Sequence, residues 1–208
     1  MINITIPNTP KDFNFQIRRD SILDINAQVI VNAANTQLTK GGGIDGLIHE
    51  KGGQAYASEH TKLSKAYQQN YPEGYATMLS SGDLATKVNS TITNVIVVAG
   101  PQSDDPDYET KLYNCYRNSL ELAHKQGKTS IAFPSISTGI FGGDMNKSAE
   151  VAVKAVSDFM LAHPDTELKT ISIHGYAVND ADAVGARRDD ALIPAYQKAV
   201  SATPTSTS

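Results

Sequence analysis

The stretch VIVNAANTQLTKGGGIDGLIHEKGG, residues 29–53, carries most of the information about fold and function. It starts with β-branched residues typical of a buried strand and passes through two asparagines into three consecutive glycines. Asp45 and His49 follow at a four-residue spacing, which places two side chains on one face of a helix. Serial glycines lose much backbone entropy on folding, so we expect this loop to have a compensating use.

Other β-type segments follow along the chain, separated by helical patterns. Apolar or alternating runs predict strands near residues 13–17, 28–32, 92–98, 129–133 and 169–173. Because strands alternate with helices, we expect an α/β fold: a three-layer α/β/α sandwich with a mixed, largely parallel central sheet. In such sheets ligands bind beyond the carboxyl ends of the strands, where residues 32–45 and 134–143 would lie.

Apolar residues spaced three and four positions apart predict the helices. Two are expected over residues 110–125 and 148–161, the second with Asp144 and Asn146 available as caps. A third is expected over about 45–67, with Gly52-Gly53 as the point where it would break, and a short one near 190–200.

The composition bounds the class of protein. A chain of 208 residues with 40% hydrophobic and 19% charged residues predicts a single domain over residues 1–200, with a disordered polar tail at 201–208. A net charge of −4 gives no reason to expect direct nucleic-acid binding. Cys115 is the single cysteine, which excludes an internal disulfide and a cysteine-based metal cluster. With neither a membrane-length apolar run nor a secretory pattern, we expect a cytoplasmic monomer without membrane contact, cofactor or metal.

The glycine-rich loops suggest an anion site. Bare backbone N–H groups that lead into a helix N-terminus bind phosphate, and residues 41–43 and 137–143 both have this form. GGGIDG also matches the dinucleotide pattern G-x-G-x-x-G. However, nine residues separate Val31 from Gly41 and no acidic residue follows about twenty positions later, so a Rossmann site is rejected. Ser137 lacks the flanking glycines of a serine-hydrolase elbow.

Simpler structural roles compete with these functional ones. Either glycine loop alone is equally well an ordinary strand-to-helix connection, and Asp45 is equally well a helix cap. His49 fits a packing role, Asn32 and Asn35 fit turns, and Cys115 fits the core. The other four histidines, His60, His124, His163 and His174, show no spacing typical of metal ligands.

Several motifs together resemble a known family. NAAN at 32–35, GGGIDGLIH at 41–49, VIVVAGP at 95–101, YRNSLELA at 116–123 and ISTGIFGG at 136–143 resemble macrodomains, in particular MacroD-type ADP-ribosylhydrolases. The resemblance extends from about residue 17 to about 178. It implies a hydrolase that removes ADP-ribose from mono-ADP-ribosylated acidic side chains, deacetylates O-acetyl-ADP-ribose, or both. A non-catalytic ADP-ribose reader is the alternative, and an adaptor with an unused pocket is a third reading.

The resemblance also implies a set of site residues. It assigns catalysis to Asp45, Asn35 and His49, with Asp45 acting on a water at the distal ribose. It assigns ADP-ribose binding to Asp20, Ser21, Ile22, Ala34, Asn35, Gly41, Gly42, Gly43, Ile44, Ser137, Thr138, Gly139, Ile140, Phe141, Gly142 and Tyr176.

Within that set, the resemblance gives individual roles. Asp20 would bind the adenine amino group, residues 137–142 the diphosphate, Phe141 the distal ribose and Tyr176 the adenine ring. The sequence departs from the family pattern at two places. Arg19 stands where a glycine usually precedes the adenine-binding aspartate, and Gly143-Asp144 stand where an aromatic residue and a proline often follow the diphosphate loop.

Overall fold

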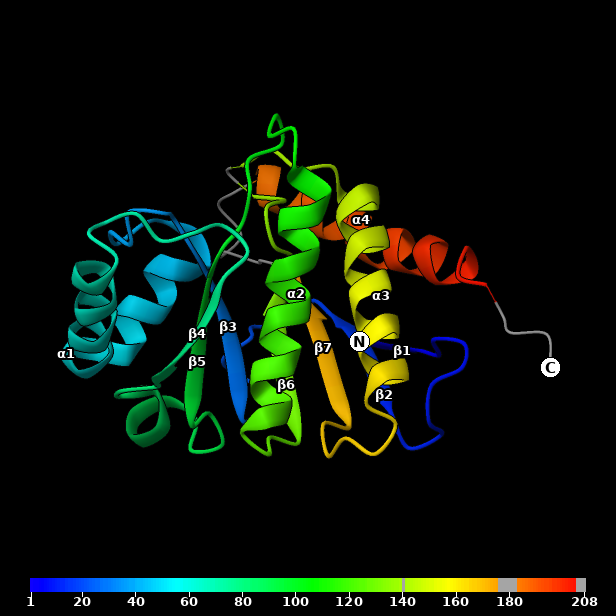
Figure 1. Cartoon of the computed structure of the whole chain (residues 1–208), viewed down its shortest axis with the longest axis horizontal. Helices are drawn as coiled ribbons and strands as arrows, with labels where there is room; N and C mark the ends of the chain where they lie inside the picture. Colours follow the sequence, from blue (N-terminus) through cyan, green and yellow to red (C-terminus); the bar gives the residue numbers. More distant parts are fainter. Residues whose placement is uncertain (140, 176–182, 205–208) are drawn as a thin grey trace.

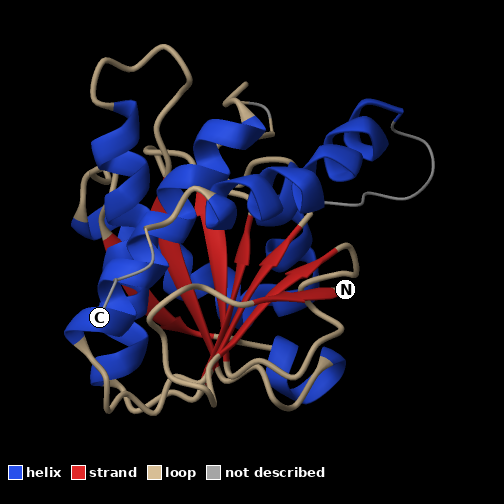
Figure 2. Cartoon of the chain, turned by 90° about the vertical axis from the view of Figure 1, so that its right-hand side faces the viewer, coloured by secondary structure: helices blue, strands red, loops and turns tan. Residues whose placement is uncertain are grey.

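The central element is a seven-stranded mixed sheet in the order β1-β2-β7-β6-β3-β5-β4 (Figure 1). The computed structural model describes residues 1–139, 141–175 and 183–204, with the backbone alone for 183–190. The strands are β1 (Ile2–Ile4), β2 (Asn14–Arg18), β3 (Val29–Ala34), β4 (Ala76–Ser80), β5 (Asn94–Ala99), β6 (Ser130–Pro134) and β7 (Thr170–His174). Only the edge strands β1 and β4 pair antiparallel, so the prediction of a largely parallel sheet is confirmed. Figure 2 shows the strands splayed like a fan by the sheet's twist.

Helices cover both faces of this sheet, as predicted for a three-layer sandwich. They are α1 (Gly43–Ala66), the π-helical turn η1 (Leu84–Val88), α2 (Tyr108–Lys125), α3 (Met145–Ala162) and α4 (Ala183–Ser201). One buried cluster joins the sheet to α2, α3 and the C-terminal half of α4. A second joins the other face to α1 and η1. None of the helices in the described part of the chain has the length and apolarity needed to cross a bilayer.

The alternation of side chains along β3 decides what faces α1. Val29 and Val31 point into the cluster with α2 and α3, whereas Ile30 and Ala34 point into the cluster with α1. Asn32 shares the parity of Ile30 and Ala34, so its side chain lies under α1 and is fully buried. A polar side chain in a β-branched strand is thereby placed against the first turn of α1.

Helix α1 breaks inside, at the point that the paired glycines suggested. Gly53 has φ 63° and ψ −164°, a conformation open almost only to glycine, and Figure 1 shows α1 as two helical segments that change direction. The turn after β4 packs into the break. There the N–H of Asp83 donates to the carbonyl of Gly52 over 2.9 Å, which satisfies a group that the helix no longer bonds.

Gly82 gives a test of this packing. It has φ 58°, and a Cβ atom there would lie 2.5 Å from Tyr56 N and 2.7 Å from Gly52 O, both backbone atoms. We expect Gly82→Ala to lower the free energy of unfolding by at least about 2 kcal/mol, from backbone strain and overpacking together. Gly127→Ala is the matched control, because Gly127 has φ 65° but no atom within 4 Å of a Cβ. Urea denaturation that gives equal losses for both variants would contradict the packing account.

The predicted elements compare well with the observed ones, and the differences have physical reasons. All five predicted strands and the helices α1, α2 and α3 are present, and the Asp144 side chain caps α3 by accepting from Lys147 N over 2.9 Å. Asn146 lies inside α3 and is not its N-cap. The sequence reading missed β1 and β4, which are edge strands with mostly half-buried residues and therefore weak hydropathy signals. Helix α4 is longer than the short helix expected near 190–200.

Candidate functional site

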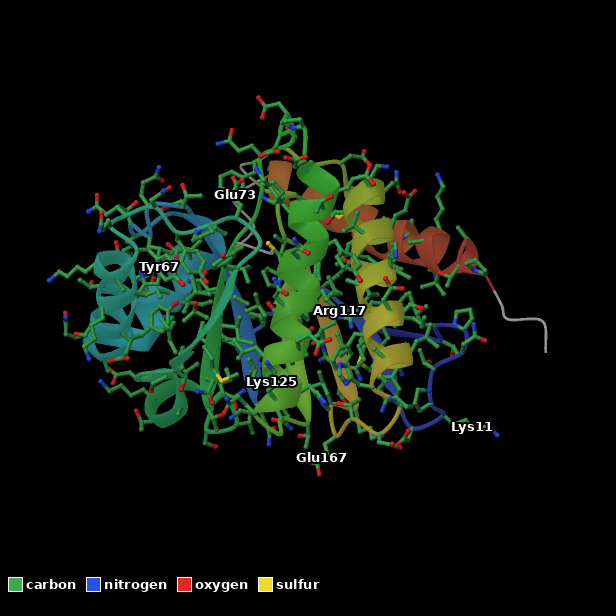
Figure 3. The ribbon with its side chains drawn as sticks, in the orientation of Figure 1. Lys11, Tyr67, Glu73, Arg117, Lys125 and Glu167 are labelled. Atoms are coloured by element: carbon green, nitrogen blue, oxygen red, sulfur yellow. The ribbon has the colours of Figure 1, made fainter. Side chains whose placement is uncertain are left out.

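The residues singled out from the sequence gather at one edge of the sheet. The parallel strands all end there, so the loops that follow β2, β3, β5, β6 and β7 meet beyond their carboxyl ends. Figure 3 shows Lys125 and Glu167 at the opposite end of the molecule, where α2 ends and the chain enters β7. The candidate site thus combines segments from residue 20 to residue 175.

Asp45 lies in the first turn of α1, and each of its two carboxylate oxygens accepts a hydrogen bond. Asn32 Nδ2 donates to Oδ1 over 2.7 Å, and the N–H of Gly41 donates to Oδ2 over 2.6 Å. The residue is 3% exposed. Burial acts to raise the pKa of the Asp45 carboxyl, but its contacts with His49, Gly41 and Asn32 outweigh burial and leave the pKa below the ordinary value. Asp45 is therefore an anion at neutral pH, in a position that the helix N-terminus also favours.

Two imidazoles approach the same carboxylate. His49 Nε2 lies 3.5 Å from Asp45 Oδ1, as the four-residue spacing predicted, and His60 Nε2 lies 4.0 Å from that oxygen. Burial lowers the pKa of His60, and the neighbouring His49 lowers it further against the opposing effect of Asp45. His60 was set aside in the sequence because it shows no ligand spacing with His124, His163 or His174, and it lies fifteen residues after Asp45.

Asn32 and Tyr56 complete this buried group, although neither was predicted from the sequence to have a functional role. Asn32 Nδ2 also lies 2.9 Å from the Tyr56 hydroxyl oxygen, so one amide group spans Asp45 and Tyr56. Burial raises the pKa of the Tyr56 phenol, which stays protonated. The sequence did contain one indication for Asn32: in a strand, it lies on the same face as Ile30 and Ala34. The turn role considered for Asn32 is wrong, because the residue lies inside β3.

The first glycine loop passes between Asn35 and Asp45. Asn35 holds the loop by bonding Thr39 at both ends of its amide: Nδ2 donates to the Thr39 carbonyl over 2.9 Å, and Oδ1 accepts from Thr39 N over 3.1 Å. A Cβ atom on Gly41 would lie 3.4 Å from Asp45 Oδ2 and 3.7 Å from Asn35 Nδ2. Gly42 caps α1 without a side chain, Gly43 has φ 58°, Ile44 packs at the edge of the α1 cluster and Ala34 is buried.

The second glycine loop, after β6, is held in a strained conformation. Ser137 has φ 62°, which is uncommon for a residue other than glycine, and its carbonyl accepts from Gly143 N over 2.8 Å. The Thr138 hydroxyl bonds the Ser135 carbonyl, and Gly142 N donates to Gly139 O over 3.1 Å. Strain of this kind persists where surrounding contacts enforce it and is common at ligand sites. Phe141 O accepts from Ser103 N, which ties the loop to the segment after β5.

The adenine end predicted from the resemblance has a distinct arrangement. Asp20 pairs with Arg18 through two contacts, one of 2.8 Å between Arg18 Nε and Asp20 Oδ1, which hold the pKa of Asp20 below its ordinary value. His174 Nδ1 lies 2.9 Å from the Asp20 carbonyl oxygen and ties β7 to this loop. Ser21 forms a local turn by accepting from Leu23 N over 3.2 Å, and Ile22 is buried.

Two of the predicted binding residues, Ile140 and Tyr176, lie outside the described residues. The other predicted binding residues lie in the loops at this edge or at their junctions with β3 and α1. Their roles toward a ligand stay predictions.

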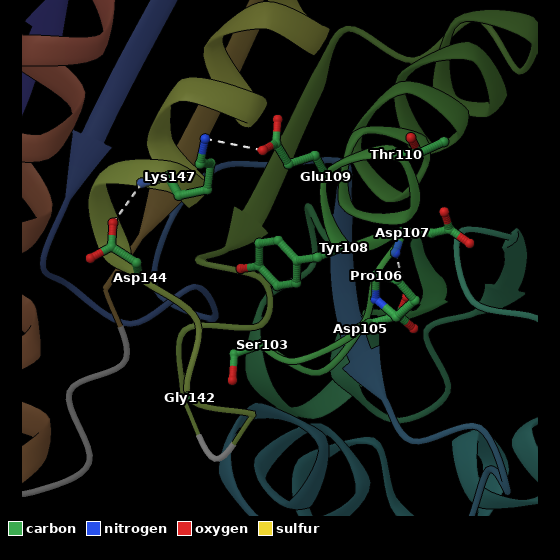
Figure 4. A pocket seen from close by; sticks show the side chains of 10 residues that line it. All are labelled: Ser103, Asp105, Pro106, Asp107, Tyr108, Glu109, Thr110, Gly142, Asp144 and Lys147. Carbon is green, nitrogen blue, oxygen red and sulfur yellow. Dashed lines mark hydrogen bonds and ion pairs between the residues drawn. The ribbon is translucent and has the colours of Figure 1, made fainter.

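A cavity of about 600 Å³ lies beside the second glycine loop, between the segment after β5 and the start of α3 (Figure 4). Tyr108 points from the start of α2 toward the loop that contains Gly142 and Asp144. A Cβ atom on Gly143 would clash with the Tyr108 hydroxyl and lie 2.6 Å from Ser137 O. A glycine at position 143, where the family often has a larger residue, therefore has a steric reason. The Tyr108 hydroxyl occupies the space that a larger side chain would need.

The comparisons agree with this architecture. The family model described as "Macro domain" matches residues 31–152, from β3 through both glycine loops into α3. The chain belongs to the macro domain family. It is 39% identical over 142 residues to a protein named O-acetyl-ADP-ribose deacetylase from Escherichia coli K12, which covers 68% of this chain and 77% of the relative. It is 41% identical over 148 residues to an uncharacterised protein of Thermoplasma volcanium, which covers 70% of this chain and 76% of that one.

Solved macrodomain structures are similar to the whole fold. The macrodomain of Oceanobacillus iheyensis, solved with ADP, superposes with a TM-score of 0.77 at 26% identity and covers 96% of this chain and 94% of that one. The Trypanosoma brucei macrodomain, solved in complex with ADP-ribose, gives a TM-score of 0.68 at 26% identity and covers 89% and 68% of the two chains. The fold and the family that the sequence motifs indicated are therefore confirmed.

Proposed function

We propose that this macrodomain binds ADP-ribose at the carboxyl edge of its sheet and hydrolyses an ester at the distal ribose. The observation that carries the proposal is the arrangement around Gly41, where bare backbone lies between the Asn35 amide and the Asp45 carboxylate. A ribose can approach that backbone closely and meet an amide on one side and an anion on the other. Relatives at 38–39% identity are named O-acetyl-ADP-ribose deacetylase, which supports this reaction class.

The two glycine loops divide the ligand between them. The glycine loop after β6 leads into the N-terminus of α3 and would take the diphosphate, while the loop over 41–43 ahead of α1 would take the ribose beyond it. No lysine or arginine side chain is required in this arrangement, because helix N-termini and turned backbone attract phosphate by themselves.

The chemistry proposed for the site is addition of water to an acyl carbon. The water oxygen attacks the ester carbonyl, a tetrahedral intermediate forms, and the ribose oxygen leaves with a proton, which releases a carboxylic acid and ADP-ribose. Asp45 is a weak base because its pKa is low, so its contribution is to orient the water and to accept its proton as the bond forms. His49 and Asn32 would hold the carboxylate in its rotamer.

We extend the proposal to esters on proteins, namely ADP-ribose attached to aspartate or glutamate side chains. Those esters join the same ribose to an acyl group, so the same water attack releases a free side-chain carboxylate. A reader that binds without hydrolysis is the second candidate, because Asp45 is nearly fully buried and both of its oxygens already accept hydrogen bonds.

The test offers two substrates and one product. O-acetyl-ADP-ribose and a glutamate-linked mono-ADP-ribosylated protein are each incubated with the protein, and release of ADP-ribose is followed. Release from both supports the full proposal, and release from the acetyl ester alone restricts it to the small molecule. Absence of release, together with thermal stabilisation by ADP-ribose, would establish a reader. A ligand at one hundred times its Kd should add about 2.7 kcal/mol to the free energy of unfolding.

A further inference from the structure

The buried group at the start of α1 contains three atoms that can each bind a metal ion. Asp45, His49 and His60 each offer one such atom, and the three atoms lie within 4.8 Å of one another. The two imidazole rings meet edge to face, with centroids 4.5 Å apart and planes inclined by 79°. In this orientation both Nε2 atoms approach the same carboxylate oxygen, at 3.5 Å and 4.0 Å.

The break in α1 creates this convergence. In an unbroken helix, the fifteen residues from Asp45 to His60 would span roughly 22 Å along the axis at 1.5 Å per residue. The 4.0 Å distance between His60 Nε2 and Asp45 Oδ1 therefore depends on the break at Gly53. Figure 1 shows the two segments of α1 running in different directions. Gly53 adopts a conformation open almost only to glycine. The approach of His60 to Asp45 therefore depends on a glycine at this position.

Apart from their approach to Asp45, the two imidazole Nε2 atoms have no polar partner in the described part of the chain. His49 Nε2 and His60 Nε2 are both buried without a hydrogen-bond partner, and the two side chains are 8% and 2% exposed. Buried polar atoms in native proteins nearly always have a partner. Two such atoms beside one anionic oxygen are therefore available to bind a cation between them.

We propose that Asp45, His49 and His60 form a binding site for a divalent transition-metal ion of the zinc class. Bonds of about 2.0–2.2 Å in a tetrahedral arrangement place ligand atoms roughly 3.3 Å apart, so small side-chain rotations bring the present distances to those of a zinc site. Two imidazoles with one carboxylate suit Zn²⁺, Co²⁺, Ni²⁺ or Fe²⁺, whereas Mg²⁺ and Ca²⁺ prefer oxygen ligands alone.

The surroundings of Asp45 are those of an oriented metal ligand. Asn32 Nδ2 donates to the same oxygen that faces the imidazoles, and Gly41 N holds the other oxygen. Hydrogen bonds of this kind fix the direction of a ligating carboxylate and raise metal affinity. Three protein ligands leave a fourth tetrahedral position for water.

The metal would also control the proposed hydrolase, and this consequence rests on the proposed function. An ion on Asp45 Oδ1 removes the negative charge with which Asp45 would orient and deprotonate water. We therefore infer that zinc binding inhibits hydrolysis and that a chelator restores it. The binding site itself is independent of this consequence and is tested without any enzyme assay.

The first experiment measures metal binding to chelator-treated protein. Zn²⁺ is titrated in competition with a chromophoric chelator, Co²⁺ serves as a spectroscopic probe of a tetrahedral site, and thermal unfolding reports stabilisation. We expect one ion per chain, a visible Co²⁺ spectrum of the tetrahedral type and a higher Tm with Zn²⁺. His60→Leu keeps a side chain of similar size and should lower Zn²⁺ affinity at least about a hundredfold.

His163→Gln is the matched control, since His163 Nε2 also lies beside a carboxylate, at 2.8 Å from Glu121 Oε2, but belongs to a partly exposed pair. This variant should bind Zn²⁺ like the parent chain. The proposal is overturned if His60→Leu binds as tightly as the parent, if His163→Gln loses the ion, or if the parent takes up none. In the last case the imidazoles and Asp45 form only a proton-sharing group.

The enzyme assay then separates the two proposals. Inhibition by Zn²⁺ in the parent chain, and its loss in His60→Leu, would support metal control of the hydrolase. A chain that binds Zn²⁺ but releases no ADP-ribose from either ester would retain the metal site and refute the proposed hydrolase. A chain that hydrolyses its substrate at the same rate with Zn²⁺ bound would overturn the inhibitory role.

Discussion

Replacing Asp45 with alanine should lower the rate of ADP-ribose release at least about a hundredfold while ADP-ribose still binds. General-base assistance is worth roughly 10²–10⁴-fold, and Asp45 is the anionic side chain that borders the Gly41 loop. The loop proposed to hold the diphosphate lies on another segment, so most contacts with the ligand should survive. Turnover is measured on O-acetyl-ADP-ribose in the presence of a chelator, and binding is measured by calorimetry.

Asp45→Asn distinguishes a role of the carboxylate in the reaction from a role in holding the loop. Alanine removes one of the two acceptors of Asn32 Nδ2 and the acceptor of the part-buried Gly41 N, which by itself costs stability. Asp45→Asn keeps the volume and one acceptor oxygen but removes the charge. If both variants lose turnover and keep binding, the carboxylate acts in the reaction. Full activity in Asp45→Asn would exclude Asp45 as the proton acceptor, whereas loss of ADP-ribose binding in both would indicate that Asp45 mainly holds the loop.

The arrangement around Asp45 shows how far sequence reasoning reaches. The four-residue spacing to His49 was enough to predict their proximity, because helical periodicity is a local property. The paired glycines likewise predicted the break in α1. The approach of His60 could not be predicted in this way, since it depends on the angle at Gly53, which the turn after β4 fixes by filling the break.

Strand parity and tertiary contacts explain the other differences. Asn32 was weighed only as a turn residue, although its position in β3 already placed it on the same face as Ile30 and Ala34. Arg19 is the departure visible in the sequence before Asp20, but the residue that the structure pairs with Asp20 is Arg18, at the end of β2. Likewise, the reason for Gly143 lies in Tyr108, a residue 35 positions earlier that only the folded chain brings beside it. The contact of Gly143 with Tyr108 depends on how distant segments of the chain pack together, and one sequence alone does not predict that packing.

Gly139→Glu should abolish ADP-ribose binding without harm to the fold, and this is the second large effect. Gly139 lies in the loop proposed to hold the diphosphate, and no atom lies within 4 Å of a Cβ atom built on it. A side chain therefore fits, and its effect comes from charge. A carboxylate beside backbone N–H groups would occupy the anion site and repel the diphosphate. We expect the Kd for ADP-ribose to rise at least about a hundredfold, in the range that loss of charge-assisted hydrogen bonds to two phosphates would produce.

Gly139→Ala and Gly139→Gln are the controls for this charge effect. Alanine adds only the Cβ atom, and glutamine adds the length of the glutamate side chain without its negative charge. Calorimetric titration should give near-parent affinity for alanine, an intermediate value for glutamine and no measurable binding for glutamate, with thermal unfolding unchanged across the series. Equal affinities for glutamine and glutamate would show that bulk, not charge, closes the site. Parent-like affinity in Gly139→Glu would mean that the diphosphate lies elsewhere, because an anion in the loop cannot coexist there with a second one without a large cost.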